Sequence, residues 1–267
     1  MSKATDTQVA AFTRRNTELA RMFLSGERDQ AYVLQALQEI TEGKFVLADR
    51  FGRYNDKLLP LWQQLNLLKQ FNILHWDNVL TDEQFAAVDT SGDHVQSVDD
   101  LEILYVDFGS PEKNIEAWWK VLVATQPNAW RWDGLKTGRK NLRLDPNTKL
   151  YEPGIHRVRI NLVAHWEPEK GRTIDEVRPQ AKAAGEFLAH AEAMAAYGLH
   201  AELLQEQDGE NLPYVDLTGY QATVSGDEAW THVPYLSWGR DDRGVRLSAS
   251  WSAYRVQGWA APVVRES

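Results

Sequence analysis

The sequence predicts an α+β protein with a helical N-terminal part and a mixed region that ends in an antiparallel β subdomain. Three observations lead to this prediction. Apolar residues recur at helical spacing early in the chain, a polar and acidic stretch follows at 89–100, and short alternating runs punctuated by glycine fill the last quarter. Helices first and strands last are typical of α+β folds. We therefore expect a helical region at 1–95 and a mixed α+β domain with C-terminal β-hairpins at 96–267.

The first part of the chain contains two helical patterns. Residues 8–43 have the pattern of a helix, a turn and a second helix, with breaks at Gly26 and Gly43. The second of these helices has no lysine or arginine on its polar face, which favours a packing unit over a DNA-reading motif. A further helix is expected at 58–68.

Capping residues mark the start of three more helices. The runs Thr81-Asp-Glu-Gln84 and Thr173-Ile-Asp-Glu176 are capping boxes. Ser110-Pro111 supplies a cap and a proline at the first helical position. After the second capping box, the spacing of apolar residues predicts one helix from Pro179 to a stop at Gly198.

Strand patterns dominate the remainder. LEILYVDF at 101–108 is apolar on both faces, as in a central strand, and IHRVRINLVAHW at 155–166 alternates. VPYLSW at 233–238 and VRLSASW at 245–251 are expected to pair as a hairpin across GRDDRG. WAAPVVRE at 259–266 is expected to be the last strand.

Composition excludes several functions. The formal charge of −9 argues against attraction of the whole protein to nucleic acid or anionic lipid. The chain contains no cysteine, which removes disulfides, thiol catalysis and cysteine metal sites. The first residues lack the apolar segment of a signal peptide, and no window resembles a transmembrane span. We expect a cytoplasmic protein without a cofactor and without membrane contact.

Motifs for catalysis are absent from the sequence. It contains no nucleophile elbow, no phosphate-binding loop and no dinucleotide fingerprint. A row of Lys182, Glu186 and His190 at four-residue spacing is the candidate for a carboxylate/histidine site. Two possible ligands do not make a metal site, and ordinary pairing along a helix face is the favoured interpretation. We therefore assign no catalytic or metal-binding residue.

One segment combines basic and aromatic residues. Aromatic side chains stacked on bases and cations on phosphates hold single-stranded nucleic acid, so this segment is an alternative functional site. The acidic charge of the protein instead favours a structural loop whose cations pair with carboxylates. The residues are Trp130, Arg131, Trp132, Lys136, Arg139, Lys140 and Arg143.

Tryptophan is unusually frequent, with 11 residues against 8 phenylalanines and 9 tyrosines. Tryptophan concentrates in cores and in binding faces. Trp251 is in phase with Val245 and Leu247 and is expected in the core. The loop at 252–259 mixes aromatic, basic and amide side chains without periodicity, which is typical of an adaptable recognition surface. The candidate ligand-binding residues are Trp238, Tyr254, Arg255 and Trp259.

The C-terminal half also resembles known proteins. HAEAMAAYGLHAELL, LPYVDLTGY and the hairpin AWTHVPYLSWGRDDRGVRLSASW with the ending WAAPVVRE resemble the C-terminal ends of bacterial proteins without an assigned activity. The ending is also similar to the closing hairpins of C-type-lectin-like domains of the formylglycine-generating-enzyme and variable-receptor type. This resemblance implies a β scaffold that presents loops for ligand binding. The chain lacks the cysteines and calcium-type acidic motifs of those domains, so no enzymatic activity is implied.

We therefore predict a non-catalytic binding or interaction protein that uses loops of the C-terminal β subdomain. Its partner is an unidentified protein or small ligand. Two alternatives stay open: an enzyme with an unrecognised carboxylate/histidine site, and contact with nucleic acid through the segment 130–143.

Overall fold

The computed structural model describes most of the chain after residue 51. The described residues are 52–91, 96–126, 128–136, 141–223 and 229–265, and they belong to one compact unit, Phe51–Ser267. The helices expected at 8–43 lie outside the described residues. Among the described helices, none is both long and apolar enough to cross a bilayer.

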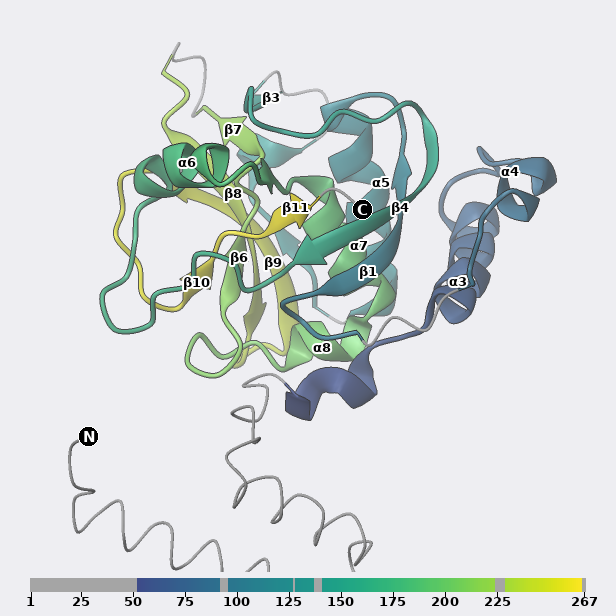
Figure 1. Ribbon diagram of the computed structural model, residues 1–267, viewed down its shortest axis with the longest axis horizontal. Helices are drawn as coiled ribbons and strands as arrows, with labels where there is room; N and C mark the ends of the chain where they lie inside the picture. Colours follow the sequence, from purple (N-terminus) through teal and green to yellow (C-terminus); the bar gives the residue numbers. More distant parts are fainter. Residues whose placement is uncertain (1–51, 92–95, 127, 137–140, 224–228, 266–267) are drawn as a thin grey trace, which may run out of the picture. The chain divides into compact units, whose positions relative to one another are not determined.

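Helices and mainly antiparallel strands build this unit, which confirms the α+β class (Figure 1); the pairs β10–β6 and β2–β9 are parallel. A four-stranded sheet has the order β1-β4-β11-β5, and β11 runs antiparallel to both of its neighbours. β1 and β4 pair from Leu101 with Ile160 to Asp107 with Gly154. The strands are β1 (Leu101–Asp107), β4 (Gly154–Asn161), β11 (Val263–Arg265) and β5 (Phe187–Leu188).

The second sheet contains seven strands. Its main path is β10-β6-β8-β7-β3, β9 pairs with β8, and β2 pairs with β9. The predicted hairpin is confirmed, because β8 and β9 pair from His232 with Trp251 to Gly239 with Gly244. The strands are β2 (Trp130–Arg131), β3 (Leu142–Leu144), β6 (Tyr214–Asp216), β7 (Tyr220–Ala222), β8 (His232–Gly239), β9 (Gly244–Trp251) and β10 (Trp259–Ala260).

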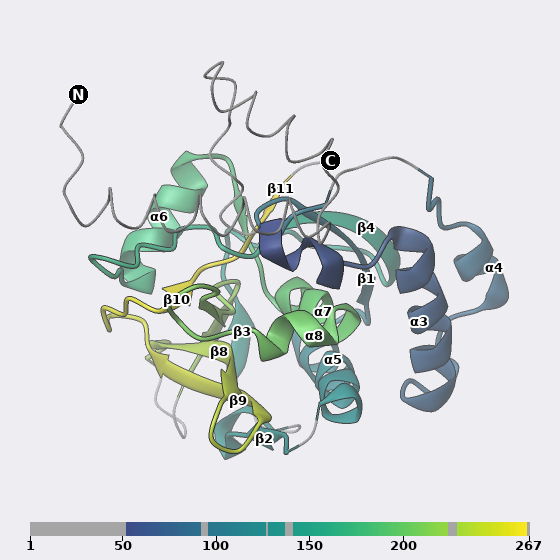
Figure 2. The same cartoon turned by 90° about the horizontal axis from the view of Figure 1, so that it is seen from below.

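Helices surround and separate the two sheets (Figure 2). Every residue of α7 is buried, and this helix packs against α5 and β1. The three capped starts predicted at Thr81, Ser110 and Thr173 are confirmed. The helical segments are η1 (Gly52–Lys57), α3 (Leu61–Leu74), α4 (Asp82–Ala86), α5 (Pro111–Thr125), η2 (Asp133–Leu135), α6 (Ile174–Ala183), α7 (Ala191–Leu199) and α8 (Ala201–Gln205).

β1 is buried along its whole length, as expected, but it is an edge strand and not a central one. The reason is α3, which covers the open edge. The Gln64 side chain donates to the carbonyl of Glu102 at 3.0 Å and accepts from the N–H of Leu104 at 2.9 Å. α3 and β1 therefore form one packing unit, and the boundary expected near residue 95 falls inside it.

The helix predicted from Pro179 to Gly198 is wrong, because the chain breaks in its middle. α6 ends at Ala183, Gly185 has a φ of 72°, and β5 follows before α7 begins. The N–H of Gly185 bonds to Lys182 O and that of Glu186 to Ala181 O, which is a Schellman motif.

Candidate functional site

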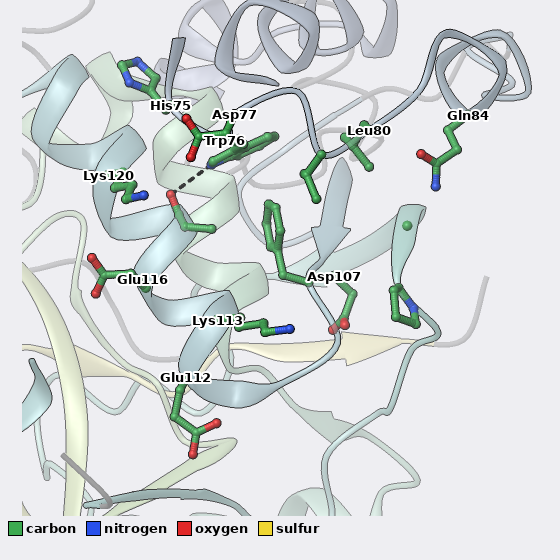
Figure 3. A pocket seen from close by; sticks show the side chains of 15 residues that line it. His75, Trp76, Asp77, Leu80, Gln84, Asp107, Glu112, Lys113, Glu116 and Lys120 are labelled. Atoms are coloured by element: carbon green, nitrogen blue, oxygen red, sulfur yellow. Dashed lines mark hydrogen bonds between the residues drawn. The ribbon is translucent and has the colours of Figure 1, made fainter. Parts of the chain in front are cut away.

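A cavity of about 450 Å³ lies between the α3–α4 connection, the C-terminal end of β1 and one face of α5 (Figure 3). We call it the α5 cavity. Its volume falls in the range of small-molecule sites, about 300–1,000 Å³. Its walls are mainly apolar and include Trp76, Val79, Leu80, Phe108, Ala117 and Pro153.

Trp76 forms the aromatic wall of the α5 cavity and is held in place. Its indole N–H donates to the carbonyl of Ala117 at 3.1 Å, a bond that ties the α3–α4 connection to α5. Its ring meets the rings of Phe108 and Trp118 edge-on, with centroids 5.0 and 5.2 Å apart. These contacts fix the ring without a ligand.

The backbone that carries Trp76 is also fixed. Asn72 bonds both to the carbonyl of Leu80 (2.9 Å) and to its N–H (3.0 Å), which closes the connection into a loop. Asp77 and Asn78 adopt φ values of 53° and 56° within this loop. Aspartate and asparagine tolerate this left-handed conformation better than most residues, so the sequence suits the turn.

Asp107 lies at the inner end of the α5 cavity, where β1 ends. Its Oδ1 accepts from the N–H of Gly109 at 2.7 Å, and its Oδ2 accepts from Asn114 Nδ2 at 2.7 Å and from the Tyr105 hydroxyl at 3.2 Å. Asn114 in turn accepts from the N–H of Phe108. Three neutral groups thus donate hydrogen bonds to this buried carboxylate.

Some of the charged side chains at the mouth of the α5 cavity are paired with other described residues of the protein, and others are not. Lys113 points toward the interior and Glu112 points away from it (Figure 3). Glu116 is bound by Arg131 at 2.8 Å. Lys113 forms no ion pair with any residue that the structure describes. Lys113 and Lys120 therefore place two ammonium groups at the mouth of the α5 cavity, and the hydrogen-bonded Asp107 carboxylate lies at its inner end.

A smaller cavity of about 80 Å³ shares Asp107 with the α5 cavity. We call it the polar cavity. Its polar lining comes from β1, the start of α5, the segment before β4 and the start of α7. The residues are Asp107, Ser110, Asn114, Lys149, Tyr151 and His190.

Glu192 lies beside the polar cavity and is completely buried. Its Oε2 accepts from the N–H of His190 at 2.7 Å and lies 3.3 Å from His190 Nδ1. Burial and then the Glu192 carboxylate raise the pKa values of Tyr105, Tyr151 and Tyr220. The three hydroxyls therefore stay protonated at neutral pH.

The four predicted ligand-binding residues lie in different surroundings. Trp238 is buried, and the Trp259 ring packs against the rings of two tyrosines of β6 and β8. Arg255 pairs with Glu176. Tyr254, at 64%, and Arg255 are the exposed members of the four. None of the four lines the α5 cavity or the polar cavity.

The expectation that Trp251 belongs to the core is wrong. Trp251 is 56% exposed, whereas Trp238 is 8% exposed. Trp251 has the phase of the buried Val245 and Leu247, but it is the last residue of β9, and no residue of this strand after Leu247 is buried. The alternation of apolar and polar residues predicts on which face of the strand a side chain lies. It does not predict where along the strand the layer that covers this face ends.

The described side chains of the basic and aromatic segment 130–143 contact different partners. Arg131 pairs with Glu116 and Lys136 with Asp133, which agrees with the expectation of cations paired to carboxylates. Trp130 is half exposed and Trp132 is partly buried, while Arg143 lies over the ring of Trp230. Arg139 and Lys140 lie outside the described residues.

The row of Lys182, Glu186 and His190 does not exist on one helix face, because of the break at Gly185. Glu186 lies 3.3 Å from His165 Nε2, and His190 turns to the polar cavity beside Glu192. In the described part of the chain, no three histidine or acidic side chains are placed to hold a metal ion.

No sequence pattern singles out Trp76, Lys113, Tyr151 or Glu192, because these residues come together from distant segments. Asp107 could have been noticed, since it is a polar residue at the end of a buried strand and directly before a helix start. Comparisons with protein-family models, with curated proteins and with solved structures found no match.

Proposed function

We propose that this protein binds a small organic ligand with an apolar body in the α5 cavity. The observation that supports the proposal is a preformed cavity of ligand size, with an aromatic wall that hydrogen bonds and ring contacts hold in place. A preformed wall lowers the entropy cost of binding. This is a binding function, as the sequence led us to expect, at a different place in the fold.

The polar groups of the α5 cavity would orient the ligand. Lys113 at the mouth offers a donor, and Gln84 of α4 lines the opposite rim (Figure 3). The Gln84 carbonyl is occupied by the N–H of Thr81, so its NH₂ group faces a ligand. A ligand with an acceptor group at one end and an apolar ring system at the other fits this arrangement.

The test uses 1-anilinonaphthalene-8-sulfonate, an aromatic dye with one anionic group, in a fluorescence titration. Val79 and Ile73 are both exposed and apolar, but only Val79 lines the cavity. We expect Val79→Glu to weaken dye binding about tenfold, which corresponds to about 1.4 kcal/mol, and Ile73→Glu to leave it unchanged. Equal affinities of both variants and the wild type would contradict a site in the α5 cavity.

The loops of the C-terminal β subdomain are a second candidate, favoured by the exposed ring of Tyr254. Tyr254→Ala belongs in the same titration, because the rings of Trp238 and Trp259 are packed and their removal would disturb the fold. Loss of dye binding in Tyr254→Ala, with full binding in Val79→Glu, would place the site on the C-terminal loops instead.

A further inference from the structure

A third cavity, of about 250 Å³, lies between the turn after β3 and one face of α6 and shares no lining residue with the α5 cavity or the polar cavity. We call it the α6 cavity. Its lining is polar apart from two prolines: Asp145, Pro146, Asn147, Arg178, Pro179 and Lys182. Figure 1 shows α6 on the same side of the molecule as β3 and β7.

One hydrogen bond and one ion pair hold Arg178 in the wall of the α6 cavity. Its Nη2 donates to the carbonyl of Tyr220 at 3.2 Å, and its Nε lies 3.1 Å from Asp145 Oδ2. Asp145 also accepts from the N–H of Asn147 at 2.9 Å and from Gln221 Nε2 at 2.7 Å. The Asp145 charge is thus compensated, and the guanidinium is oriented with little freedom.

Lys182 adds a second cation to the same wall. It follows Arg178 by four residues on α6, so the two side chains lie on one face of the helix. Lys182 is exposed and forms no ion pair with another described residue. Asp175 lies 4.0 Å from Arg178 Nη1 and is itself largely exposed, and the buried Asp216 carboxylate also acts electrostatically on Arg178.

A third cation lies next to this wall. Arg143 Nε donates to Gln221 Oε1 at 2.7 Å, and the same Gln221 side chain donates to Asp145. The Arg143 guanidinium stands 4.4 Å from the centre of the Trp230 ring. Arg143, Arg178 and Lys182 therefore lie near Asp145 and Asp175, while the charge of Asp216 is compensated by Arg172, although the whole protein carries a charge of −9. Such a local reversal of sign attracts anions.

We propose that the α6 cavity binds the phosphate group of inorganic phosphate or of a phosphorylated small molecule. A phosphate monoester is close to a dianion at neutral pH, because its second pKa lies near 6. A phosphate dianion can pair with the fixed guanidinium of Arg178 and the ammonium group of Lys182 together. The single negative charge of a carboxylate would compensate only one of these two cations. This site is independent of the ligand proposed for the α5 cavity.

The proposal is tested by isothermal titration calorimetry at pH 7.5 with two probes, inorganic phosphate and glycerol 3-phosphate, at constant ionic strength. Lys182→Met removes the mobile cation from an exposed position, and Lys170→Met is the matched control because Lys170 is exposed and lies outside the α6 cavity. We expect at least tenfold weaker binding in Lys182→Met, unchanged binding in Lys170→Met, and recovery in Lys182→Arg.

The two probes distinguish the sources of the phosphate group. Tighter binding of glycerol 3-phosphate would identify a phosphorylated small molecule as the ligand, and equal or tighter binding of inorganic phosphate would identify the free ion. Absence of heat with both probes would overturn the proposal. So would equal affinity in Lys182→Met and the wild type, because binding would then occur elsewhere.

Discussion

In this fold, single polar side chains form hydrogen bonds to backbone groups that no neighbouring helix or strand pairs with. Gln64 is the clearest example, because it is completely buried and all its hydrogen-bonding atoms are used. Its NH₂ group donates to the carbonyls of Leu59 and Glu102, and its carbonyl accepts from Leu104. The Gln64 side chain thus gives the edge of β1 hydrogen bonds of the kind that a neighbouring strand would form.

We expect Gln64→Leu to lower the free energy of unfolding by about 3 kcal/mol, because buried backbone groups of β1 lose their partners. Gln70→Leu is the matched control, since Gln70 is exposed on the same helix. Urea unfolding at 25 °C measures both. Similar stabilities of the two variants would show that the edge of β1 does not depend on Gln64.

At the scale of the element, Gly185 decides where α6 ends. Its φ of 72° is costly for a residue with a Cβ, although a Cβ at this position would meet no neighbouring atom within 4 Å. We therefore expect Gly185→Ala to cost about 1 kcal/mol from backbone strain alone, and Gly185→Asn to cost less. Thermal unfolding of the two variants gives the comparison. A Gly185→Ala variant as stable as the wild type would contradict the role of the Schellman turn.

The helices and strands that could be predicted from the sequence are those with a local signal. Capping boxes and the hairpin were predictable, because their signals are local. The helix across Gly185 was mispredicted because the apolar residues of β5 and α7 together imitate one helical stripe. The C′ glycine was the local signal against it. The edge position of β1 was not predictable, because the covering Gln64 comes from a distant helix.

At the scale of the whole molecule, cavities are harder to predict than elements. The α5 cavity joins Trp76, Phe108 and Pro153, and the α6 cavity joins Asp145 and Arg178. These residues lie on separate elements, and their proximity follows from the packing of the elements. The aromatic C-terminal loop was conspicuous in the sequence for its composition, but composition does not indicate whether side chains share a cavity.

β11 connects the two parts of the core, and this gives a prediction for the whole unit. Val264 belongs to the large core cluster, whereas Val263 packs in a smaller cluster with Ala164, Val177, Ala181, Leu188 and Ala261. We expect Val263→Ala and Val264→Ala each to cost about 2 kcal/mol. Arg265→Ala, at an exposed position of the same strand, should cost less than about 0.5 kcal/mol.

The shape of the unfolding transition tests the connection itself. β11 lies between β4 and β5 and carries one valine into each cluster, so neither cluster can lose its packing without disturbing this strand. In both valine variants, far-ultraviolet circular dichroism and tryptophan fluorescence should therefore follow the same urea midpoint. Separate midpoints in Val263→Ala would mean that the smaller cluster unfolds alone, and that β11 does not couple the two sides of its sheet.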